Sequence, residues 1–128
     1  MNRNVSQPFA RVLCVDDDED TCELLSVIFP ELEFVFAHSI GSALPHIGGQ
    51  EAELYILDNW LPDGSGVQLC KKIREMNTSV PIVFTSAAAR NRDRDEALSA
   101  GADRYIIKPY EPEFIRKIVK ELFSLTNA

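Results

Sequence analysis

Three aspartates follow directly on two short apolar runs of the sequence. Asp16 and Asp17 come after the run at 11–15, and Asp58 comes after the run at 54–57. Two carboxylates about 4 Å apart repel each other by about 4 kcal/mol at an effective dielectric constant of about 20. A cluster of three carboxylates therefore persists where it binds a cation or a proton. Such oxygen ligands suit Mg²⁺, and an aspartate beside the metal can itself be a nucleophile that forms an aspartyl phosphate.

Two later apolar runs end in a cation and in hydroxyl groups. Lys108 follows the run at 105–107, and Thr85 and Ser86 follow the run at 81–84. An ammonium group can bind a phosphoryl oxygen, and a hydroxyl can donate a hydrogen bond to one. A carboxylate, a divalent cation, an ammonium and a hydroxyl together suit phosphoryl transfer, in which positioning and charge neutralisation supply most of the catalysis.

These residues need a scaffold that brings distant runs together, and the hydrophobic pattern predicts one. Short apolar runs without polar alternation are typical of strands buried on both faces of a parallel sheet. Five such runs occur, at 11–15, 33–37, 54–57, 81–84 and 105–107. Helical patterns follow each of them, at 18–30, 39–47, 67–76, 91–100 and 114–122. The alternation predicts a doubly wound (βα)5 fold with helices on both faces of the sheet.

Local signals define several ends of the predicted helices. Asp18 or Asp20 is expected to cap the first helix, and Ser39 the second. Pro45 lies inside the second pattern, which predicts a short or distorted helix there. In an open parallel sheet, ligands bind outside the carboxyl ends of the strands. The aspartates, the lysine and the hydroxyls are therefore expected at one edge.

The composition narrows the class of protein further. The 128 residues carry 20 acidic and 13 basic side chains, for a formal net charge of −7. This balance argues against direct nucleic-acid binding, which needs a basic face. No apolar run approaches the roughly 18–20 residues of a membrane span. We expect an arm at 1–10, one domain at 11–125 and a tail at 126–128.

The cysteines and histidines carry no motif of their own. Cys14, Cys22 and Cys70 lack metal-ligand spacing, so they are interpreted as buried or half-buried thiols of a cytoplasmic protein. His38 and His46 likewise stand without a supporting motif. We therefore expect none of these five residues to be a ligand or a phosphate carrier.

In their order and positions, the motifs of this chain resemble those of a known family. The match covers about 11–125 and consists of Val15-Asp16-Asp17, Leu57-Asp58, Pro62, Gly66, the run from Pro81 to Ser86-Ala87, and the segment 100–109. The chain is similar to response-regulator receiver domains of two-component signalling, especially the single-domain chemotaxis regulators. The resemblance implies the flavodoxin-like fold, with a five-stranded parallel sheet in the order 2-1-3-4-5.

The resemblance also implies roles for the residues around the metal. Asp58 matches the aspartate that accepts the phosphoryl group, and Asp17 matches the direct Mg²⁺ ligand. Asp16 matches the acid that usually holds the metal through water. Lys108 matches the lysine that binds phosphoryl oxygens. Trp60 matches the position whose backbone carbonyl binds the metal, while its side chain either overhangs the phosphoryl site or serves to dock a partner.

A switch is implied at the ends of the last two predicted strands. Ser86 matches the hydroxyl that moves toward the phosphate, which leaves Thr85 as a packed strand residue. Tyr105 matches the aromatic residue whose rotamer follows that hydroxyl. The bond between Lys108 and Pro109 is expected to be cis, because the family turns sharply there.

The implied function is a phosphoacceptor switch rather than an enzyme that turns over an external substrate. A sensor histidine kinase or a phosphotransfer protein would phosphorylate Asp58, and slow autodephosphorylation would reset it. The signal would leave through the face of the fourth helix, fifth strand and fifth helix, to a downstream protein or to an output domain from which this chain was excised. A monomer and a phosphorylation-dependent dimer both fit this scheme.

Three other functions are alternatives to the switch. A haloacid-dehalogenase-like phosphatase has a second aspartate two residues after the first, where this chain has Trp60. A flavodoxin-like cofactor binder needs a glycine- and hydroxyl-rich phosphate loop after the first strand, where this chain has acids. An inert receiver used for docking usually lacks an acid or the lysine, and this chain retains them. Arg90, Arg92, Arg94 and the pair Arg116-Lys117 form either a basic patch on the output face or scattered solvated charge.

Overall fold

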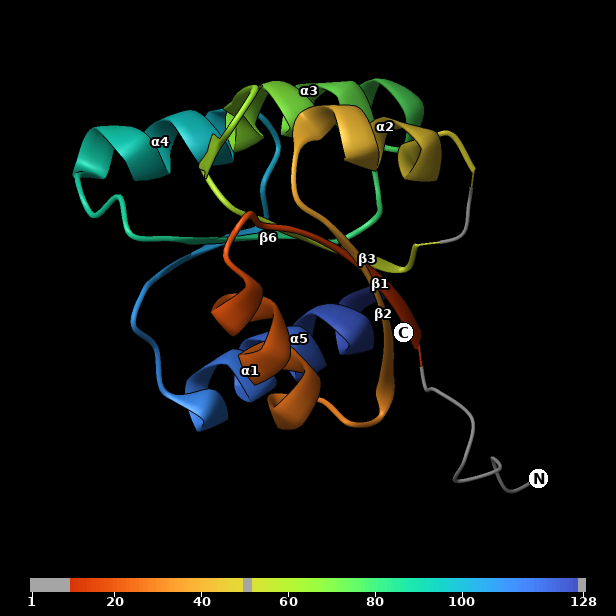
Figure 1. The fold of residues 1–128 in the computed structure, drawn as a ribbon, viewed down its shortest axis with the longest axis vertical. Helices are drawn as coiled ribbons and strands as arrows, with labels where there is room; N and C mark the ends of the chain where they lie inside the picture. The colour runs from red at the N-terminus through yellow and green to blue at the C-terminus, as the bar shows by residue number, and fades with distance from the viewer. Residues whose placement is uncertain (1–9, 50–51, 127–128) are drawn as a thin grey trace.

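The computed structural model describes residues 10–49 and 52–126, and of 125–126 only the backbone. Within these residues, five helices and seven strands follow one another. Figure 1 shows how they are arranged. Their order is β1 (Ala10–Val15), α1 (Glu19–Ile28), β2 (Leu32–Ala37), α2 (Ile40–Ile47), β3 (Leu54–Leu57), β4 (Trp60–Leu61), β5 (Gly64–Ser65), α3 (Gly66–Met76), β6 (Ile82–Ser86), α4 (Asn91–Ser99), β7 (Arg104–Ile107) and α5 (Pro112–Thr126).

The main sheet confirms the predicted fold class. Its five strands are parallel and lie in the order β2-β1-β3-β6-β7. Since β6 and β7 are the fourth and fifth strands of this sheet, the order is the predicted 2-1-3-4-5. Helices α2, α3 and α4 cover one face, and α1 and α5 cover the other (Figure 1). The connections that follow β1 and β3 lead to helices on opposite faces of the sheet (Figure 1), so the two loops separate at the carboxyl ends of these strands and leave room for a site.

The central strands β3 and β6 are buried at every position, whereas the edge strands β2 and β7 are partly exposed. Alternate residues of β1 belong to different sides of the core: Leu13 and Val15 pack in the cluster shared with α2, α3 and α4. Val12 and Cys14 pack in the cluster shared with α1 and α5. The period of two residues along the strand produces this division.

The helix starts follow the expected capping chemistry. Asp18 caps α1, and its side chain accepts a hydrogen bond from the backbone N–H of Asp20. Ser39 caps α2 in a capping box with Ser42, and α2 is only eight residues long, with Pro45 inside it. Both helices therefore begin at the carboxyl end of the preceding strand, next to the predicted site.

Some details differ from the sequence-based expectations. Strand β1 begins at Ala10, which pairs with Leu32, and α5 ends at Thr126, so both elements extend past the predicted runs at 11–15 and 114–122. The remainder of the arm (1–9) and of the tail (127–128) lies outside the described residues. Strands β4 and β5 form a short antiparallel hairpin in a segment for which the sequence pattern predicts no strand.

Two expectations about residue environment can be compared with the structure directly. All three cysteines are buried and carry no disulfide bond. Within the described chain, no helix is both long enough and apolar enough to cross a membrane.

Candidate functional site

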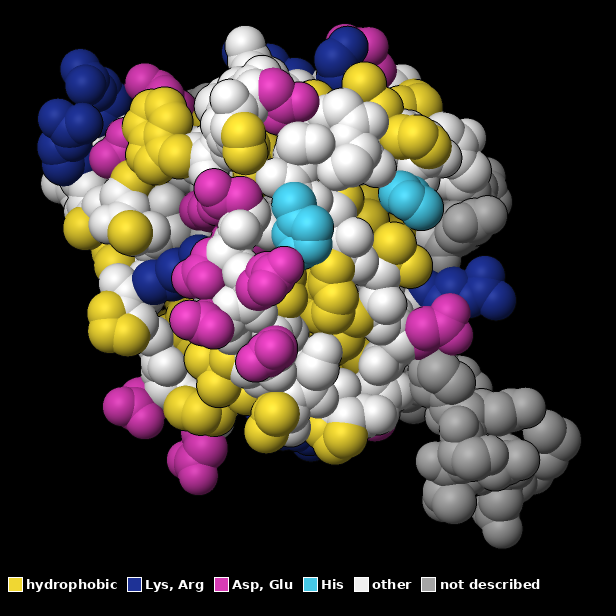
Figure 2. Space-filling view, in the orientation of Figure 1, with side chains coloured by type: hydrophobic (Ala, Val, Ile, Leu, Met, Phe, Trp, Pro, Cys, Tyr) yellow, Lys and Arg dark blue, Asp and Glu magenta, His cyan; other side chains and the backbone are white. Residues whose placement is uncertain are grey.

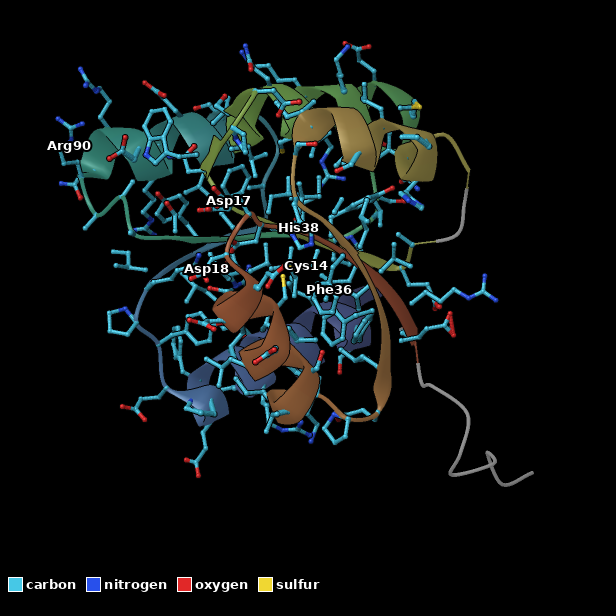
Figure 3. The ribbon with its side chains drawn as sticks, in the orientation of Figure 1. Cys14, Asp17, Asp18, Phe36, His38 and Arg90 are labelled. Atoms are coloured by element: carbon cyan, nitrogen blue, oxygen red, sulfur yellow. The ribbon has the colours of Figure 1, made fainter. Side chains whose placement is uncertain are left out.

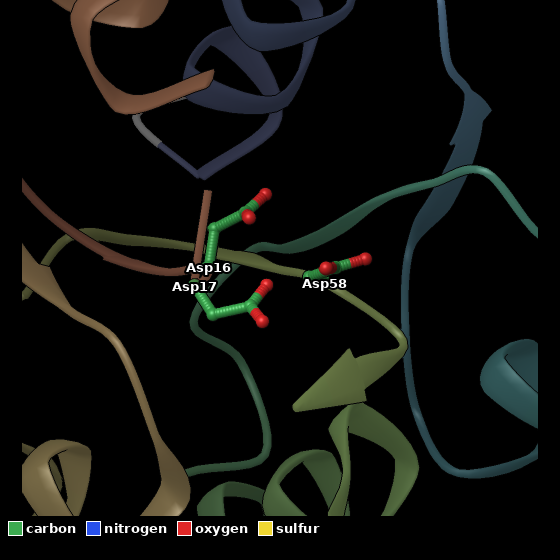
Figure 4. A group of neighbouring side chains, drawn as sticks. All are labelled: Asp16, Asp17 and Asp58. Atoms are coloured by element: carbon green, nitrogen blue, oxygen red, sulfur yellow. The ribbon is translucent and has the colours of Figure 1, made fainter. Parts of the chain in front are cut away.

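Three carboxylates converge at the carboxyl edge of the sheet. Asp16 and Asp17 follow β1, and Asp58 follows the neighbouring strand β3, where its backbone N–H donates to the carbonyl of Val15 at 2.9 Å. One carboxylate oxygen from each aspartate lies within 4.8 Å of the others (Figure 4). The three predicted metal-binding side chains are therefore together in space, with Asp16 buried and Asp17 exposed.

Asp16 is held by a hydrogen bond at every polar position. Its Oδ1 accepts from the backbone N–H of Asp18 at 2.9 Å, and its Oδ2 accepts from Lys108 Nζ at 2.8 Å. Its backbone N–H donates to the carbonyl of Ala37 at 3.0 Å, and its own carbonyl contacts Nδ1 of His38 at 2.9 Å. Both carboxylate oxygens of Asp16 are therefore already engaged in hydrogen bonds.

Lys108 supplies the positive charge of the site. It follows β7, and its backbone N–H donates to the carbonyl of Ser86 at 2.8 Å. Its Nζ lies 4.0 Å from Oδ1 of Asp58 and forms the closer ion pair with Asp16. Burial lowers the pKa of Lys108, but the hydrogen bond and charge of Asp16 and the charge of Asp58 raise it overall. The peptide bond to Pro109 is cis.

The surroundings of Asp58 raise the pKa of its carboxyl group. Burial and the charge of Asp16 raise the pKa of Asp58 to about 6, although Lys108 and the backbone N–H of Asn59 oppose the shift. Only 13% of the Asp58 side chain is exposed, so water relieves little of the repulsion. One ammonium does not balance three acids. An oxygen-only set with unbalanced negative charge fits Mg²⁺.

The hydroxyl groups of Ser86 and Tyr105 both form hydrogen bonds with the backbone of Ala88. The buried Ser86 Oγ accepts from the N–H of Ala88 at 3.1 Å, and the Tyr105 hydroxyl donates to the carbonyl of Ala88 at 2.7 Å. The Tyr105 ring stacks on Phe84, with centroids 5.9 Å apart. Thr85 packs inside the fold as expected, with its Oγ1 buried and unpaired among the described residues. Ser86 and Tyr105 thus share one backbone partner.

The hairpin of β4 and β5 carries Trp60 over this edge. Trp60 pairs with Ser65, and the N–H of Gly66 donates to the carbonyl of Asn59 at 2.8 Å. The Trp60 side chain is 60% exposed. It is therefore accessible both to a group bound at the carboxylates and to a docking partner, and the two interpretations stay open.

The surface around the carboxylates is acidic. Figure 2 shows acidic side chains gathered on one face of the molecule, with histidines beside them. Figure 3 places Asp17 and Asp18 at the start of α1, with His38 nearby on the adjacent strand end. Residues 17–20 are all exposed acids, consistent with the capping and solvated roles expected of 18–20.

Two neighbours of the site were not anticipated from the sequence. His38 supports the Asp16 carbonyl, and Asp63 accepts two hydrogen bonds from the start of α2. The Asp63-Gly64 pair is a turn signal, but nothing in it points to a distant helix. For His38 the sequence contains no signal, because its partner is a backbone atom of another strand.

A doubly wound sheet with three carboxylates and a lysine at its carboxyl edge defines the class of phosphoacceptor α/β domains. The chain belongs to the response regulator receiver domain family, whose model matches residues 12–120. Receiver domains are regulatory phosphoacceptors of two-component systems rather than enzymes with an external substrate. The expected family is therefore confirmed.

Curated relatives support the same assignment. The chain is 33% identical to the phosphate regulon transcriptional regulatory protein PhoB of Escherichia coli (strain K12), over 80% of this chain and 47% of PhoB. It is 34% identical to the regulatory protein VanR of Enterococcus faecium, over 88% of this chain and 49% of VanR. The chain thus spans about half the length of the curated relatives it matches.

Solved structures show the same fold. A two-component response regulator from Clostridium difficile is 31% identical and superimposes with a TM-score of 0.87, covering 93% of this chain and 99% of its own. A CheY-like response regulator receiver domain protein from Methanospirillum hungatei JF-1 is 29% identical with a TM-score of 0.82, covering 92% of this chain and 97% of its own.

Proposed function

We propose that this chain is a signalling switch that accepts a phosphoryl group on Asp58 from the phosphohistidine of a histidine kinase or a phosphotransfer protein. Asp16, Asp17, Asp58 and the backbone carbonyl of Trp60 would hold Mg²⁺. The observation that carries the proposal is the convergence of three carboxylates within 4.8 Å beside the Lys108 ammonium. No other described group of histidine, cysteine, aspartate or glutamate side chains comes together in this way.

The chemistry assigns one task to each side chain. A carboxylate oxygen of Asp58 attacks phosphorus in line, while the bond from phosphorus to the donor histidine breaks and the histidine nitrogen keeps the electron pair. Bound Mg²⁺ supplies charge neutralisation for the carboxylates and the phosphoryl oxygens. Lys108, 4.0 Å from the Asp58 oxygen, is placed to bind a phosphoryl oxygen. Water reaching the acyl phosphate would slowly reset the switch.

The shared partner of Ser86 and Tyr105 supports a route for the signal. To reach the phosphoryl group, Ser86 must give up its hydrogen bond to the N–H of Ala88. The Tyr105 hydroxyl donates a hydrogen bond to the carbonyl of Ala88, so a shift of the Ala88 backbone also changes the environment of Tyr105. The face of α4, β7 and α5 would then shift its population toward a second conformation that a downstream protein or an output domain recognises.

The direct test is phosphorylation of the purified chain by a small acyl phosphate with Mg²⁺. We expect the intact mass to rise by one phosphoryl group, and peptide mapping to place that group on Asp58. Omitting Mg²⁺ should prevent the gain. Phosphate on another residue, or none at all, would contradict the proposal and favour an inert docking receiver. An inert receiver would also leave Trp60 fluorescence unchanged by Mg²⁺.

Replacing Lys108 with alanine is expected to slow phosphate incorporation about 100-fold, because loss of one preorganised charged group at a reacting centre costs about 2–3 kcal/mol of transition-state stabilisation. The measurement is the initial rate with a small acyl phosphate at saturating Mg²⁺. Lys71→Ala is the matched control, since Lys71 is an exposed residue of α3. Equal rates for the two variants would remove Lys108 from the site.

The raised pKa of Asp58 predicts a pH dependence of metal binding. A ligand carboxylate must be deprotonated, so protonation competes with Mg²⁺ as the pH falls through about 6. The apparent affinity for Mg²⁺, followed by Trp60 fluorescence, should fall about fivefold from pH 6 to pH 5 and change little from pH 7 to pH 8. A flat profile between about pH 5 and 7 would show that Asp58 is not a ligand.

The oligomeric state of this chain and the classes of its partners are further parts of the proposal. We expect either a monomer or a dimer that forms on phosphorylation through α4, β7 and α5, and no direct contact of this domain with nucleic acid. Light scattering of phosphorylated and unphosphorylated protein distinguishes the two assembly states. The names of several relatives describe transcriptional regulators, which is consistent with a downstream output beyond this domain.

A further inference from the structure

Asp63 lies at the tip of the β4–β5 hairpin and contacts a distant helix. Its Oδ1 accepts from the backbone N–H of Ile40 at 2.8 Å, and its Oδ2 accepts from the N–H of Gly41 at 2.9 Å. These are the first two residues of α2, 22 and 23 positions earlier in the chain. A loop side chain thus supplies two of the acceptors that the start of this helix needs.

The contact is more than a local cap, because α2 already has one. The Ser39 hydroxyl accepts from the N–H of Ser42, and Ser42 completes the capping box. Asp63 therefore adds a tertiary connection to a helix that could start without it. The carboxylate also meets the positive end of the helix dipole, which strengthens both hydrogen bonds.

The hairpin backbone packs tightly where this connection forms. Gly64 has φ of +154°, and a Cβ placed there would lie 2.6 Å from Cδ1 of Ile40. A Cβ on Gly41 would lie 3.4 Å from Oδ2 of Asp63. The tip of the hairpin is therefore in direct contact with the first turn of α2.

The first turn of α2 is connected in turn to the Asp16 loop. Asp16 donates its N–H to the carbonyl of Ala37, and its own carbonyl contacts Nδ1 of His38. Residues 37–41 thus connect the Asp16 loop with the β4–β5 hairpin. Asp16 is hydrogen-bonded to Ala37 at one end of this segment, and Asp63 of the hairpin that contains Trp60 is hydrogen-bonded to Ile40 at the other end. These hydrogen bonds fix the relative position of the two loops.

We propose that Asp63 is a positioning residue for the metal site, holding the Trp60 hairpin at the correct separation from Asp16 and Asp17 by clamping it to the start of α2. This inference rests on the proposed function, because it assumes that the Trp60 carbonyl and the aspartates bind one Mg²⁺. Residues that orient metal ligands without touching the metal commonly affect its affinity.

The test compares Asp63→Ala with the wild type in a Mg²⁺ titration followed by Trp60 fluorescence. We expect the dissociation constant for Mg²⁺ to rise about tenfold. The phosphorylation rate at saturating Mg²⁺ should stay nearly unchanged, because Asp63 does not touch the phosphoryl group. Asp63→Asn keeps one acceptor oxygen and should give an intermediate dissociation constant. In metal-free protein, amide hydrogen exchange at Trp60 and Leu61 should be faster in Asp63→Ala.

Ser42→Ala is the matched control, since it removes the Ser42 side-chain half of the capping box of the same helix and leaves Asp63 in place. It should bind Mg²⁺ as the wild type does. If Ser42→Ala and Asp63→Ala weaken Mg²⁺ binding equally, or if Asp63→Ala binds Mg²⁺ normally, Asp63 has only a helix-capping role and the inference is wrong. A wild type that shows no Mg²⁺ response at all would instead overturn the proposed function, and the inference with it.

Discussion

Replacing Asp58 with asparagine is expected to abolish phosphate incorporation and to raise the stability of the metal-free protein. The amide is not a nucleophile toward phosphorus, so no acyl phosphate forms. The pKa of Asp58 is raised from 3.8 to about 6 by burial and by the charge of Asp16. A shift of this size corresponds to about 3 kcal/mol of free energy of folding lost when Asp58 is charged, and the neutral amide avoids that loss.

The sign of this effect defines a pH window. The folded pKa of Asp58 lies above its unfolded value, so the destabilisation is fully present above about pH 6 and disappears as the pH falls below about 4. Urea unfolding of metal-free protein should therefore show Asp58→Asn as the more stable form near neutral pH, with the difference shrinking in acid. Saturating Mg²⁺ should stabilise the wild type more than Asp58→Asn, and so reduce the difference between their free energies of unfolding.

Asp95→Asn provides the control for removing one negative charge. Asp95 is exposed on α4, and its replacement should change the free energy of unfolding by less than about 0.5 kcal/mol. If Asp58→Asn is no more stable than the wild type in the absence of metal, the carboxylates do not repel one another as their positions indicate.

Replacing Gly66 with alanine is expected to lower the free energy of unfolding by about 3 kcal/mol. A Cβ at Gly66 would lie 2.1 Å from the backbone oxygen of Asp58 and 2.9 Å from the Phe84 ring. Neither neighbour can easily move, because the backbone N–H of Asp58 donates a hydrogen bond to the carbonyl of Val15 and Phe84 is fully buried. The clash outweighs the gain of about 1 kcal/mol that alanine brings to a helix.

Gly48→Ala tests whether the effect comes from the clash or from the loss of glycine. Gly48 ends α2 with ordinary helical dihedral angles, and no atom lies within 4 Å of a Cβ placed there. Its replacement should leave stability within about 0.5 kcal/mol. Thermal or urea unfolding of both variants measures the difference, and a mild effect at Gly66 would mean that the Asp58 loop can shift.

The carboxylate site was predictable because strand ends are visible in the sequence. The apolar runs before Asp16, Asp58 and Lys108 stop abruptly, and parallel strands bring their carboxyl ends to one edge. In the structure, Lys108 Nζ lies 2.8 Å from Asp16 and 4.0 Å from Asp58, and the two carboxylates lie within 4.8 Å of each other. The roles of Ser86 and Tyr105 depend on register and rotamer, which the pattern does not determine, and they stay predictions.

Tertiary contacts to backbone atoms were not predictable. Arg74 of α3 donates to the carbonyls of Gly101 and Val80 and pairs with Asp103, which joins α3 to the loop before β6 and to the loop between α4 and β7. In the sequence, Arg74 is one charge on the polar side of a helix. The β4–β5 hairpin was missed for a similar reason, since two-residue strands leave too few positions for a periodic pattern.

The meeting of Ser86 and Tyr105 at Ala88 has a consequence for how this chain can vary. Both hydroxyls contact the main chain of residue 88, and neither contact involves its methyl group. The link between them is therefore encoded in the number of residues from 86 to 88 and not in the identity of the side chain. Exchange of Ala88 for any residue except proline, which lacks the N–H that Ser86 accepts from, should be silent for this link. Insertion of one residue between 86 and 88 would place a different peptide group between the hydroxyls and disconnect them.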